Sequence, residues 1–209
     1  MKYLKDFEDQ YVIPVIRHTK EDELYKLCLA LAEGGLKVLE VTLMSEAAFS
    51  VIKKLSERND LIIGAGTVLN KDHASRAIAS GAKFLVSPGL DEESINYSQS
   101  QNIPFIPGVI TPSEVMRAHN LGLNLLKLFP ASTFGGLEYV KNLRGPFPQM
   151  KWMLTGGITP ADVPMFKKAG ITCVGLGNHL TSQALVEKED WEGITTLTKN
   201  LLKKTREEN

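Results

Sequence analysis

One lysine, Lys127, interrupts the apolar run at residues 125–130. A short apolar run of this kind is typical of a buried strand. An unpaired ammonium ion is costly to bury, so a buried lysine tends to lose its proton. A neutral lysine is a nucleophile that forms Schiff bases with carbonyl compounds. The pattern therefore indicates covalent catalysis. The alternatives are a structural ion pair or a side chain that extends from the strand to the solvent-exposed rim of the fold.

Glu40 is the matching acidic residue, because it also lies inside an apolar run, at residues 38–42. In a strand, Glu40 and Thr42 point to the same face. A buried carboxyl group can take up and release protons during a reaction. A nucleophilic amine and a carboxyl acid/base are what Schiff-base aldol chemistry requires. The alternative is that Glu40 serves only as the counter-ion of a buried lysine.

Glycine-containing turns follow the last two apolar runs, at Gly156-Gly157 and Gly177-Asn178. In α/β barrels, such loops bind phosphate through backbone amides. Two ordinary tight turns are the alternative.

Further candidates for binding an anion precede these turns in the chain. Gly66 and Thr67 offer backbone amides and a hydroxyl group that suit a carboxylate. Arg17, at the end of the first apolar run, can pair with a carboxylate or a phosphate through two hydrogen bonds. A salt bridge at the protein surface is the alternative for Arg17.

Metal-dependent chemistry is disfavoured, because none of the four histidines stands at metal-ligand spacing from another His, Cys or carboxylate. We therefore expect no metal and no cofactor apart from a covalent Schiff base on Lys127. Cys28 and Cys173 lie in a helix pattern and a strand pattern, so we expect both in the core. No Gly-x-Ser-x-Gly nucleophile motif occurs.

The composition is that of an ordinary globular protein of 209 residues, with 43% hydrophobic and 23% charged residues. Lys+Arg and Asp+Glu both number 24, so the net charge of zero gives no indication of a nucleic-acid or membrane partner. The first residues contain no apolar signal region, and no stretch approaches the roughly 20 apolar residues that span a bilayer. We expect a cytoplasmic protein that acts on a small anionic molecule.

The elements that must position these residues alternate between strands and helices. Strands are predicted at residues 12–16, 38–42, 61–63, 84–86, 105–106, 125–129, 152–155 and 173–175. Helices are predicted near the N-terminus and around residues 24–31, 48–55, 74–78, 112–121, 161–169 and 190–204. The strands are continuous apolar runs, which indicates a parallel sheet covered by helices.

A recurring glycine just before a strand gives the count of these units. It occurs at Gly34, Gly81, Gly122 and Gly170, and each interval has room for two strand–helix units. Eight units predict a (β/α)8 TIM barrel with a short N-terminal helix, as a single domain over residues 1–209. A doubly wound open sheet is the alternative. In a barrel, the candidate residues would all lie at the carboxyl ends of the strands.

Taken together, the motifs resemble those of one family. They are Glu40-Val41-Thr42, Gly64-Ala65-Gly66-Thr67-Val68, Ser87-Pro88-Gly89, Ile106-Pro107-Gly108, Lys127-Leu128-Phe129-Pro130 and Thr155-Gly156-Gly157. Their order is similar to that in the class I 2-keto-3-deoxy-6-phosphogluconate (KDPG) / 4-hydroxy-2-oxoglutarate (KHG) aldolase family. The resemblance runs from about residue 12 to residue 180. It implies a (β/α)8 barrel that forms a homotrimer.

The resemblance also implies a role for each candidate residue. Lys127 matches the Schiff-base lysine and Glu40 the general acid/base. The residues that match substrate-binding positions are Thr67 with the Gly66 amide at the pyruvyl carboxylate, Pro88 and Phe129 along the pocket, Thr155 near C4, and Gly156, Gly157, Gly177 and Asn178 at the phosphate. We count Thr42 and Arg17 among the substrate-binding residues as well.

Two positions depart from the family pattern. Met44 stands where many members carry an arginine that binds the anionic substrate, and we expect Arg17 to take over this role. Asn178 stands where the phosphate turn usually has a serine, and its amide can still donate to a phosphate. Both departures bear on which substrate is used.

The expected function is class I aldolase cleavage of KDPG to pyruvate and glyceraldehyde 3-phosphate. Three alternatives stay open. The same chemistry could act on the galactonate epimer or on KHG. A different phosphate-binding barrel enzyme, such as an isomerase, could use Glu40 alone. A sugar-phosphate sensor would bind without turnover, and the presence of both Lys127 and Glu40 argues against it.

Overall fold

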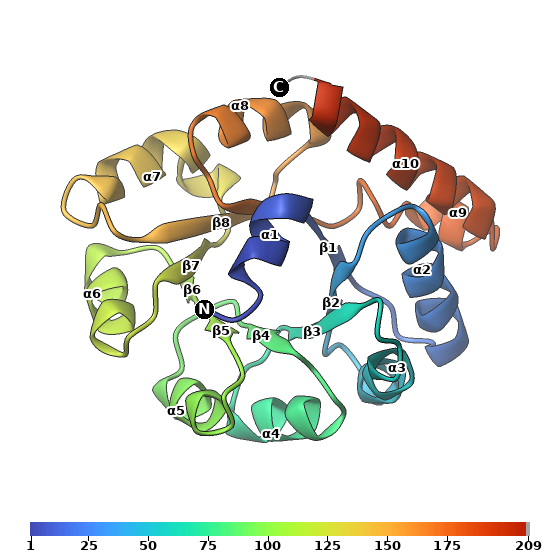
Figure 1. The fold of residues 1–209 in the computed structure, drawn as a ribbon, viewed down its shortest axis with the longest axis horizontal. Coiled ribbons are helices and arrows are strands. Elements are labelled where there is room, and N and C mark those ends of the chain that lie inside the picture. The colour runs from blue at the N-terminus through green and yellow to red at the C-terminus, as the bar shows by residue number, and fades with distance from the viewer. Residues whose placement is uncertain (208–209) are drawn as a thin grey trace.

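The computed structural model describes residues 1–207 and contains nine parallel strands, each followed by a helix or a loop (Figure 1). The strands are β1 Val12–Ile16, β2 Val38–Thr42, β3 Ile62–Gly66, β4 Phe84–Val86, β5 Phe105–Ile106, β6 Gly108–Val109, β7 Leu125–Leu128, β8 Lys151–Thr155 and β9 Cys173–Leu176. The α-helices are α1 Leu4–Gln10, α2 Glu21–Glu33, α3 Glu46–Ser56, α4 Lys71–Ala79, α5 Glu92–Ser100, α6 Pro112–Asn120, α7 Gly136–Arg144, α8 Val163–Lys168, α9 Gln183–Val186 and α10 Trp191–Glu207. Two 3-10 helices span Ser132–Phe134 and Pro160–Asp162.

The sheet closes into a barrel at Pro107, between β5 and β6. The strand order is β5-β4-β3-β2-β1-β9-β8-β7-β6, so these two short strands stand at its two ends. The amide of Ser87 donates to the carbonyl of Ile106, and the amide of Lys127 donates to the carbonyl of Pro107. The stretch at residues 105–109 is thus hydrogen-bonded on one side to the end of β4, through Ile106, and on the other side to β7, through Pro107. It fills a single strand position, which confirms the predicted (β/α)8 barrel and excludes the open sheet.

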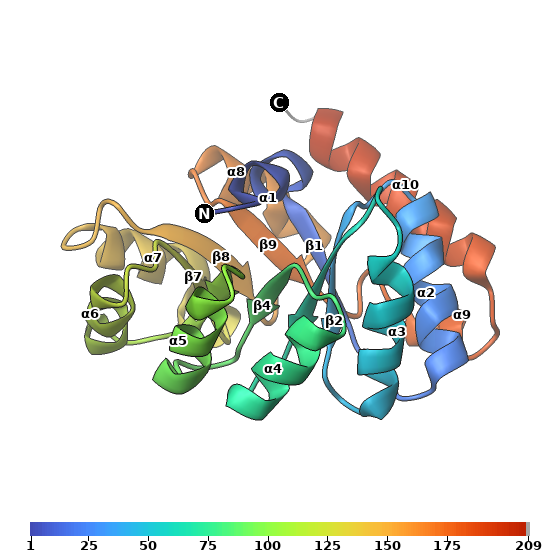
Figure 2. The ribbon, with the colours of Figure 1, turned by 60° about the horizontal axis from the view of Figure 1, so that its bottom comes forward.

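Helices surround the strands, as the alternating pattern predicts (Figures 1 and 2). The structure adds α5, α7 and α9, for which no helix was predicted. In α5 the buried positions are Ser94, Ile95 and Ser98, so two of three are small polar residues and the apolar periodicity is weak. The predicted helix at 161–169 is divided, because a 3-10 turn over Pro160–Asp162 precedes α8.

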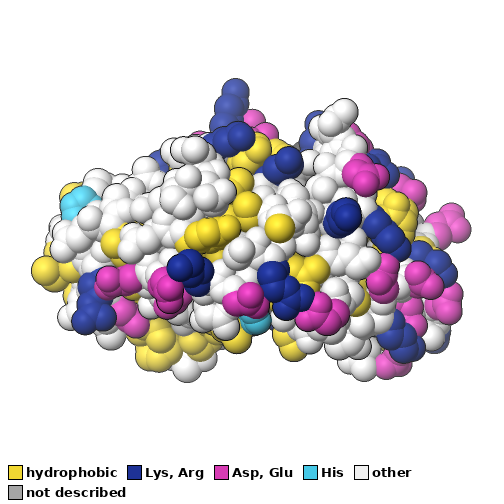
Figure 3. Space-filling view, turned by 90° about the horizontal axis from the view of Figure 1, so that it is seen from below, with side chains coloured by type: hydrophobic (Ala, Val, Ile, Leu, Met, Phe, Trp, Pro, Cys, Tyr) yellow, Lys and Arg dark blue, Asp and Glu magenta, His cyan; other side chains and the backbone are white. Residues whose placement is uncertain are grey.

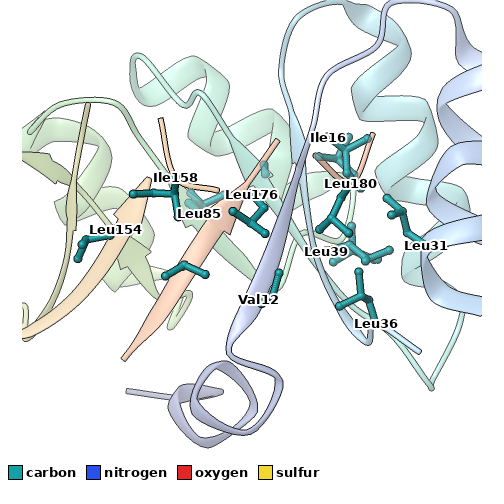
Figure 4. Packing of buried hydrophobic residues seen from close by; sticks show 14 of the residues in the cluster. Val12, Ile16, Leu31, Leu36, Leu39, Leu85, Leu154, Ile158, Leu176 and Leu180 are labelled. Carbon is teal, nitrogen blue, oxygen red and sulfur yellow. The ribbon is translucent and has the colours of Figure 1, made fainter. Parts of the chain in front are cut away.

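The hydrophobic core has an outer layer between the strands and the helices, part of which is shown in Figure 4. There, Ile16 and Leu39 on the strands lie near Leu31 of α2. Cys28 belongs to this layer, and Cys173 belongs to the barrel interior; both are buried and free. Both side chains are fully buried, which confirms the prediction that they are core residues, and this burial raises the pKa of both thiols. Within residues 1–207, no helix is long and apolar enough to cross a membrane.

The barrel interior is closed at the amino ends of the strands by α1, which lies across that opening in Figure 1. The fully buried side chain of Phe7 packs inside with Ile13, Leu125 and Met153. Its ring meets that of Phe84 edge to face, with centroids 4.9 Å apart. The predicted N-terminal helix is therefore confirmed, and it leaves only the carboxyl end of the barrel open to a ligand.

Phe7→Ala is expected to destabilise the protein by about 3–5 kcal/mol, because it leaves a cavity inside the barrel at the amino ends of the strands. Denaturant unfolding monitored by circular dichroism measures this change. Substitution of the exposed Phe134 by alanine serves as the control and should cost far less. An equal loss for the two variants would show that α1 does not close the barrel.

Candidate active site

Lys127 on β7 and Glu40 on β2 meet inside the barrel. The Lys127 Nζ lies 3.8 Å from the Glu40 Oε1, and the two side chains are only 6% and 1% exposed. The sequence places them there because side chains alternate along a strand: Val38, Glu40 and Thr42 share one face of β2, and Leu125 and Lys127 share one face of β7. The buried Val38 and Leu125 lie in the interior cluster, so the alternation carries Glu40 and Lys127 inward as well.

The carboxylate of Glu40 is poorly satisfied. Neither of its buried oxygens has a hydrogen-bond partner among the described residues, and 3.8 Å to Lys127 is too long for a hydrogen bond. A buried ion pair stabilises a fold only when its geometry is good and further hydrogen bonds surround it. The Lys127–Glu40 pair is thus poorly suited to stabilise the fold. An unsatisfied buried group of this kind is expected at a functional site.

One glycine of the neighbouring strand, Gly66 of β3, leaves space for Glu40. Gly64 and Gly108 stand opposite Glu40 and Lys127, but a Cβ on them would meet the Phe84 ring and the Pro88 backbone instead. A Cβ on Gly66 would collide with the Glu40 carboxyl group, whose Cδ and Cγ lie 2.8 Å from that position. We expected Gly66 to present its amide to a ligand; the structure shows that its missing side chain makes room for Glu40.

Gly66→Ala is therefore expected to displace the Glu40 carboxyl group and lower kcat about 10²-fold, because misplacement of a reacting group by about 1 Å costs that much. Steady-state kinetics with KDPG, the substrate that the sequence resemblance implies, measures the effect. Gly89→Ala is the matched control, since a Cβ there meets nothing within 4 Å. Equal kcat values for the two variants would contradict this role of Gly66.

A small cavity of about 210 Å³ lies at the carboxyl ends of β1, β8 and β9. Arg17, Thr155, Gly156-Gly157 and Gly177-Asn178 line it, as a shared anion site requires. The guanidinium group of Arg17 lies against Gly177, with Nη1 2.9 Å from where a Cβ would be. In the described part of the chain no carboxylate pairs with Arg17, so the surface salt bridge considered above is absent.

The backbone of this cavity is suited to an anion. Gly156 and Gly157 have φ values of 96° and 72°, a conformation that favours glycine. Across residues 1–207, the amides of Gly157 and Asn178 donate to no protein group. Free amides that converge with a guanidinium form an anion-binding concavity.

The other candidates lie around the same opening. The Thr155 Oγ1 is buried, lines the cavity and has no partner among the described residues. The ring of Phe129 has its centroid 5.1 Å from the Lys127 Nζ. Thr67 adopts a positive φ of 58° at the end of β3, and Pro88 follows β4. The hydroxyl of Thr42 donates to the carbonyl of Ile16 at 2.8 Å, so part of its bonding capacity joins β2 to β1.

One lining residue, His179, was not among the candidates. The histidines were considered only as metal ligands; the position of His179 directly after the Gly177-Asn178 turn was the available signal. Among residues 1–207, no group of three or more His, Cys, Asp and Glu side chains is arranged to hold a metal ion. A larger cavity of about 440 Å³, lined by Met1 and Leu125 among others, lies at the opposite end of β7.

Comparisons with known proteins identify the family of this chain. Residues 5–197 match the model of the KDPG and KHG aldolase family. The 2-dehydro-3-deoxy-phosphogluconate aldolase of Pseudoalteromonas atlantica is 38% identical over 92% of this chain and 90% of its own. The KHG/KDPG aldolase of Escherichia coli K12 is 37% identical over 90% of this chain and 89% of its own.

A solved structure adds the chemistry of a relative. It is that of the KDPG aldolase from Legionella pneumophila, with pyruvate captured at low pH as a covalent carbinolamine intermediate. It superposes with a TM-score of 0.89, covers 96% of this chain and 98% of its own, and is 34% identical. A carbinolamine is the adduct of an amine and a carbonyl compound. The chain therefore belongs to the KDPG and KHG aldolase family.

Proposed function

We propose that this lyase cleaves KDPG to pyruvate and glyceraldehyde 3-phosphate through an imine on Lys127. The observation that supports it most is the buried Lys127–Glu40 pair, with an unsatisfied carboxylate, at the open end of the barrel. The relatives named as KDPG aldolases share nearly the full length of the chain.

The reaction starts when the neutral Nζ of Lys127 attacks the C2 ketone of the substrate. The carbinolamine hydroxyl takes up a proton from solvent and leaves as water, which gives an iminium ion that withdraws electrons from C3. Glu40 removes the proton of the C4 hydroxyl, the C3–C4 bond breaks, and its electron pair forms an enamine at C2–C3. Glyceraldehyde 3-phosphate leaves. Glu40 returns the proton to C3, and hydrolysis of the resulting iminium ion releases pyruvate, the neutral lysine and a proton to solvent.

The remaining residues hold the two ends of the substrate. In this proposal Thr67 and the amides near Gly66 bind the carboxylate of the pyruvyl half, while Pro88 and Phe129 line the pocket between. Thr155 contacts the C4 side. The amides at Gly156-Gly157 and Gly177-Asn178, together with Arg17, bind the phosphate, since they supply a cation and free donors without a lining carboxylate. The mechanism uses no metal and no cofactor.

A panel of three substrates tests this proposal, with pyruvate release coupled to NADH oxidation. KDPG should be cleaved fastest, and its galactonate epimer and KHG more slowly. KHG is worth including because the E. coli relative is named for both substrates and because the exposed Met44 lies in the loop after β2, which carries Glu40. A higher kcat/KM for KHG than for KDPG would show that KHG, and not KDPG, is the preferred substrate.

Three expectations about the whole protein stay predictions: a single domain over residues 1–209, a cytoplasmic location and a homotrimer. In support of the trimer, Met44 and Leu69 are more than half exposed at loops on the catalytic end. Figure 3 shows apolar side chains among interspersed charges of both signs on the face over α4 and α5. Light scattering coupled to size-exclusion chromatography measures the oligomeric mass.

A further inference from the structure

A histidine lines the anion cavity besides Arg17 and Asn178. His179 lines it directly after the Gly177-Asn178 turn and is exposed. In the part of the chain that the structure describes, the side chain of His179 has no hydrogen-bond or ion-pair partner. The other loop histidine, His18, differs in this respect: its Nε2 lies 3.1 Å from the Glu23 Oε2.

A phosphate monoester offers more acceptor sites than Arg17 alone can fill. It carries close to two negative charges at neutral pH and three strong acceptor oxygens. Arg17 approaches from β1, and the glycine amides approach from the turns after β8 and β9. The residues that line the cavity include no carboxylate, so a donor on the side of His179 meets no competing acceptor.

We propose that His179 is a specificity-determining residue, whose imidazole N–H donates to the substrate phosphate. This inference rests on the proposed function and extends it, because it assigns part of the preference for a phosphorylated substrate to His179. Imidazole donates from one ring nitrogen when neutral and from both when protonated, so the contact does not require a charged ring. Neither Lys127 nor Glu40 lines this cavity, so the proposal places His179 at the phosphate and not at the proton transfer.

The expected signature is a change in substrate preference. Loss of one hydrogen bond to a charged group costs about tenfold in kcat/KM. His179→Ala should therefore lower kcat/KM for KDPG about tenfold, mainly through KM, because the phosphate is bound in the ground state and in the transition state alike. The same variant should leave kcat/KM for the unphosphorylated 2-keto-3-deoxygluconate nearly unchanged. His179→Gln, which keeps an N–H donor, should recover part of the loss.

The test measures kcat and KM for both substrates with the wild type, the two His179 variants and His119→Gln, an exposed histidine on α6. Borohydride trapping of pyruvate on each variant confirms that the imine site is folded. If His179→Ala lowers kcat/KM equally for both substrates, or leaves the phosphate preference at the wild-type value, the role of His179 is wrong. If the wild type itself does not cleave KDPG, the proposed function has failed instead.

Discussion

Lys127→Met is expected to abolish turnover of KDPG, with kcat lowered at least about 10³-fold, because no other residue of the site can form the imine. The wild type, reduced with borohydride in the presence of pyruvate, should gain a pyruvyl-derived mass on the peptide that contains Lys127. The variant should gain none. Peptide mass spectrometry after proteolysis locates the adduct.

A lysine on the neighbouring strand provides the control for this experiment. Lys151 of β8 is 41% exposed and forms a 2.6 Å ion pair with Glu8 on the surface. An exposed pair of this kind contributes at most about 1 kcal/mol, so Lys151→Met should fold, turn over KDPG and trap pyruvate like the wild type. An adduct at Lys151, or full activity in Lys127→Met, would contradict the assigned nucleophile.

The same substitution separates the chemical role of Lys127 from its structural role. Removing one member of a buried ion pair leaves the other charge uncompensated and costs about 3–5 kcal/mol in the free energy of unfolding. Lys127→Met alone should therefore be destabilised through Glu40. The double variant Lys127→Met/Glu40→Gln should recover much of that stability and none of the activity. Urea unfolding of the four proteins in this cycle measures the coupling between the two residues.

The sequence was most informative where a charged residue stood among apolar neighbours. A lysine and a glutamate inside apolar strands are costly to bury, and the period of two along each strand carries both inward. The repeated glycine before strands predicted eight units because each unit must end a helix before the next strand begins. Both inferences rest on local chemistry, which a sequence displays directly.

The features of the site that could not be predicted from the sequence depend on distances between strands. That Gly66 makes room for the carboxyl group of Glu40 follows from the register of β2 against β3, where Thr42 stands opposite Gly66. The helix α5 was missed because Ser94 and Ser98 fill buried positions that apolar residues usually occupy. His179 was not considered for the anion cavity because Arg17 and Gly157, which line the same cavity, come from distant parts of the chain.

Glu40→Gln is expected to separate imine formation from proton transfer. The amide keeps the shape of the carboxyl group but cannot accept the C4 hydroxyl proton or return a proton to C3. General acid–base catalysis contributes about 10²–10⁴-fold, so kcat for KDPG should fall by that factor. Lys127 remains in place, so the variant should still form a borohydride-trapped adduct with pyruvate.

Proton exchange at the pyruvate methyl group tests this role without the cleavage step. In D2O the wild type should exchange these protons for deuterium, because the imine and the enamine interconvert through Glu40. Proton NMR should show exchange slowed by about the same factor as kcat in Glu40→Gln and absent in Lys127→Met. Glu46→Gln, at an 80% exposed position on α3, should exchange like the wild type. If Glu40→Gln exchanges at the wild-type rate, a different group moves the proton and Glu40 is only the counter-ion of Lys127.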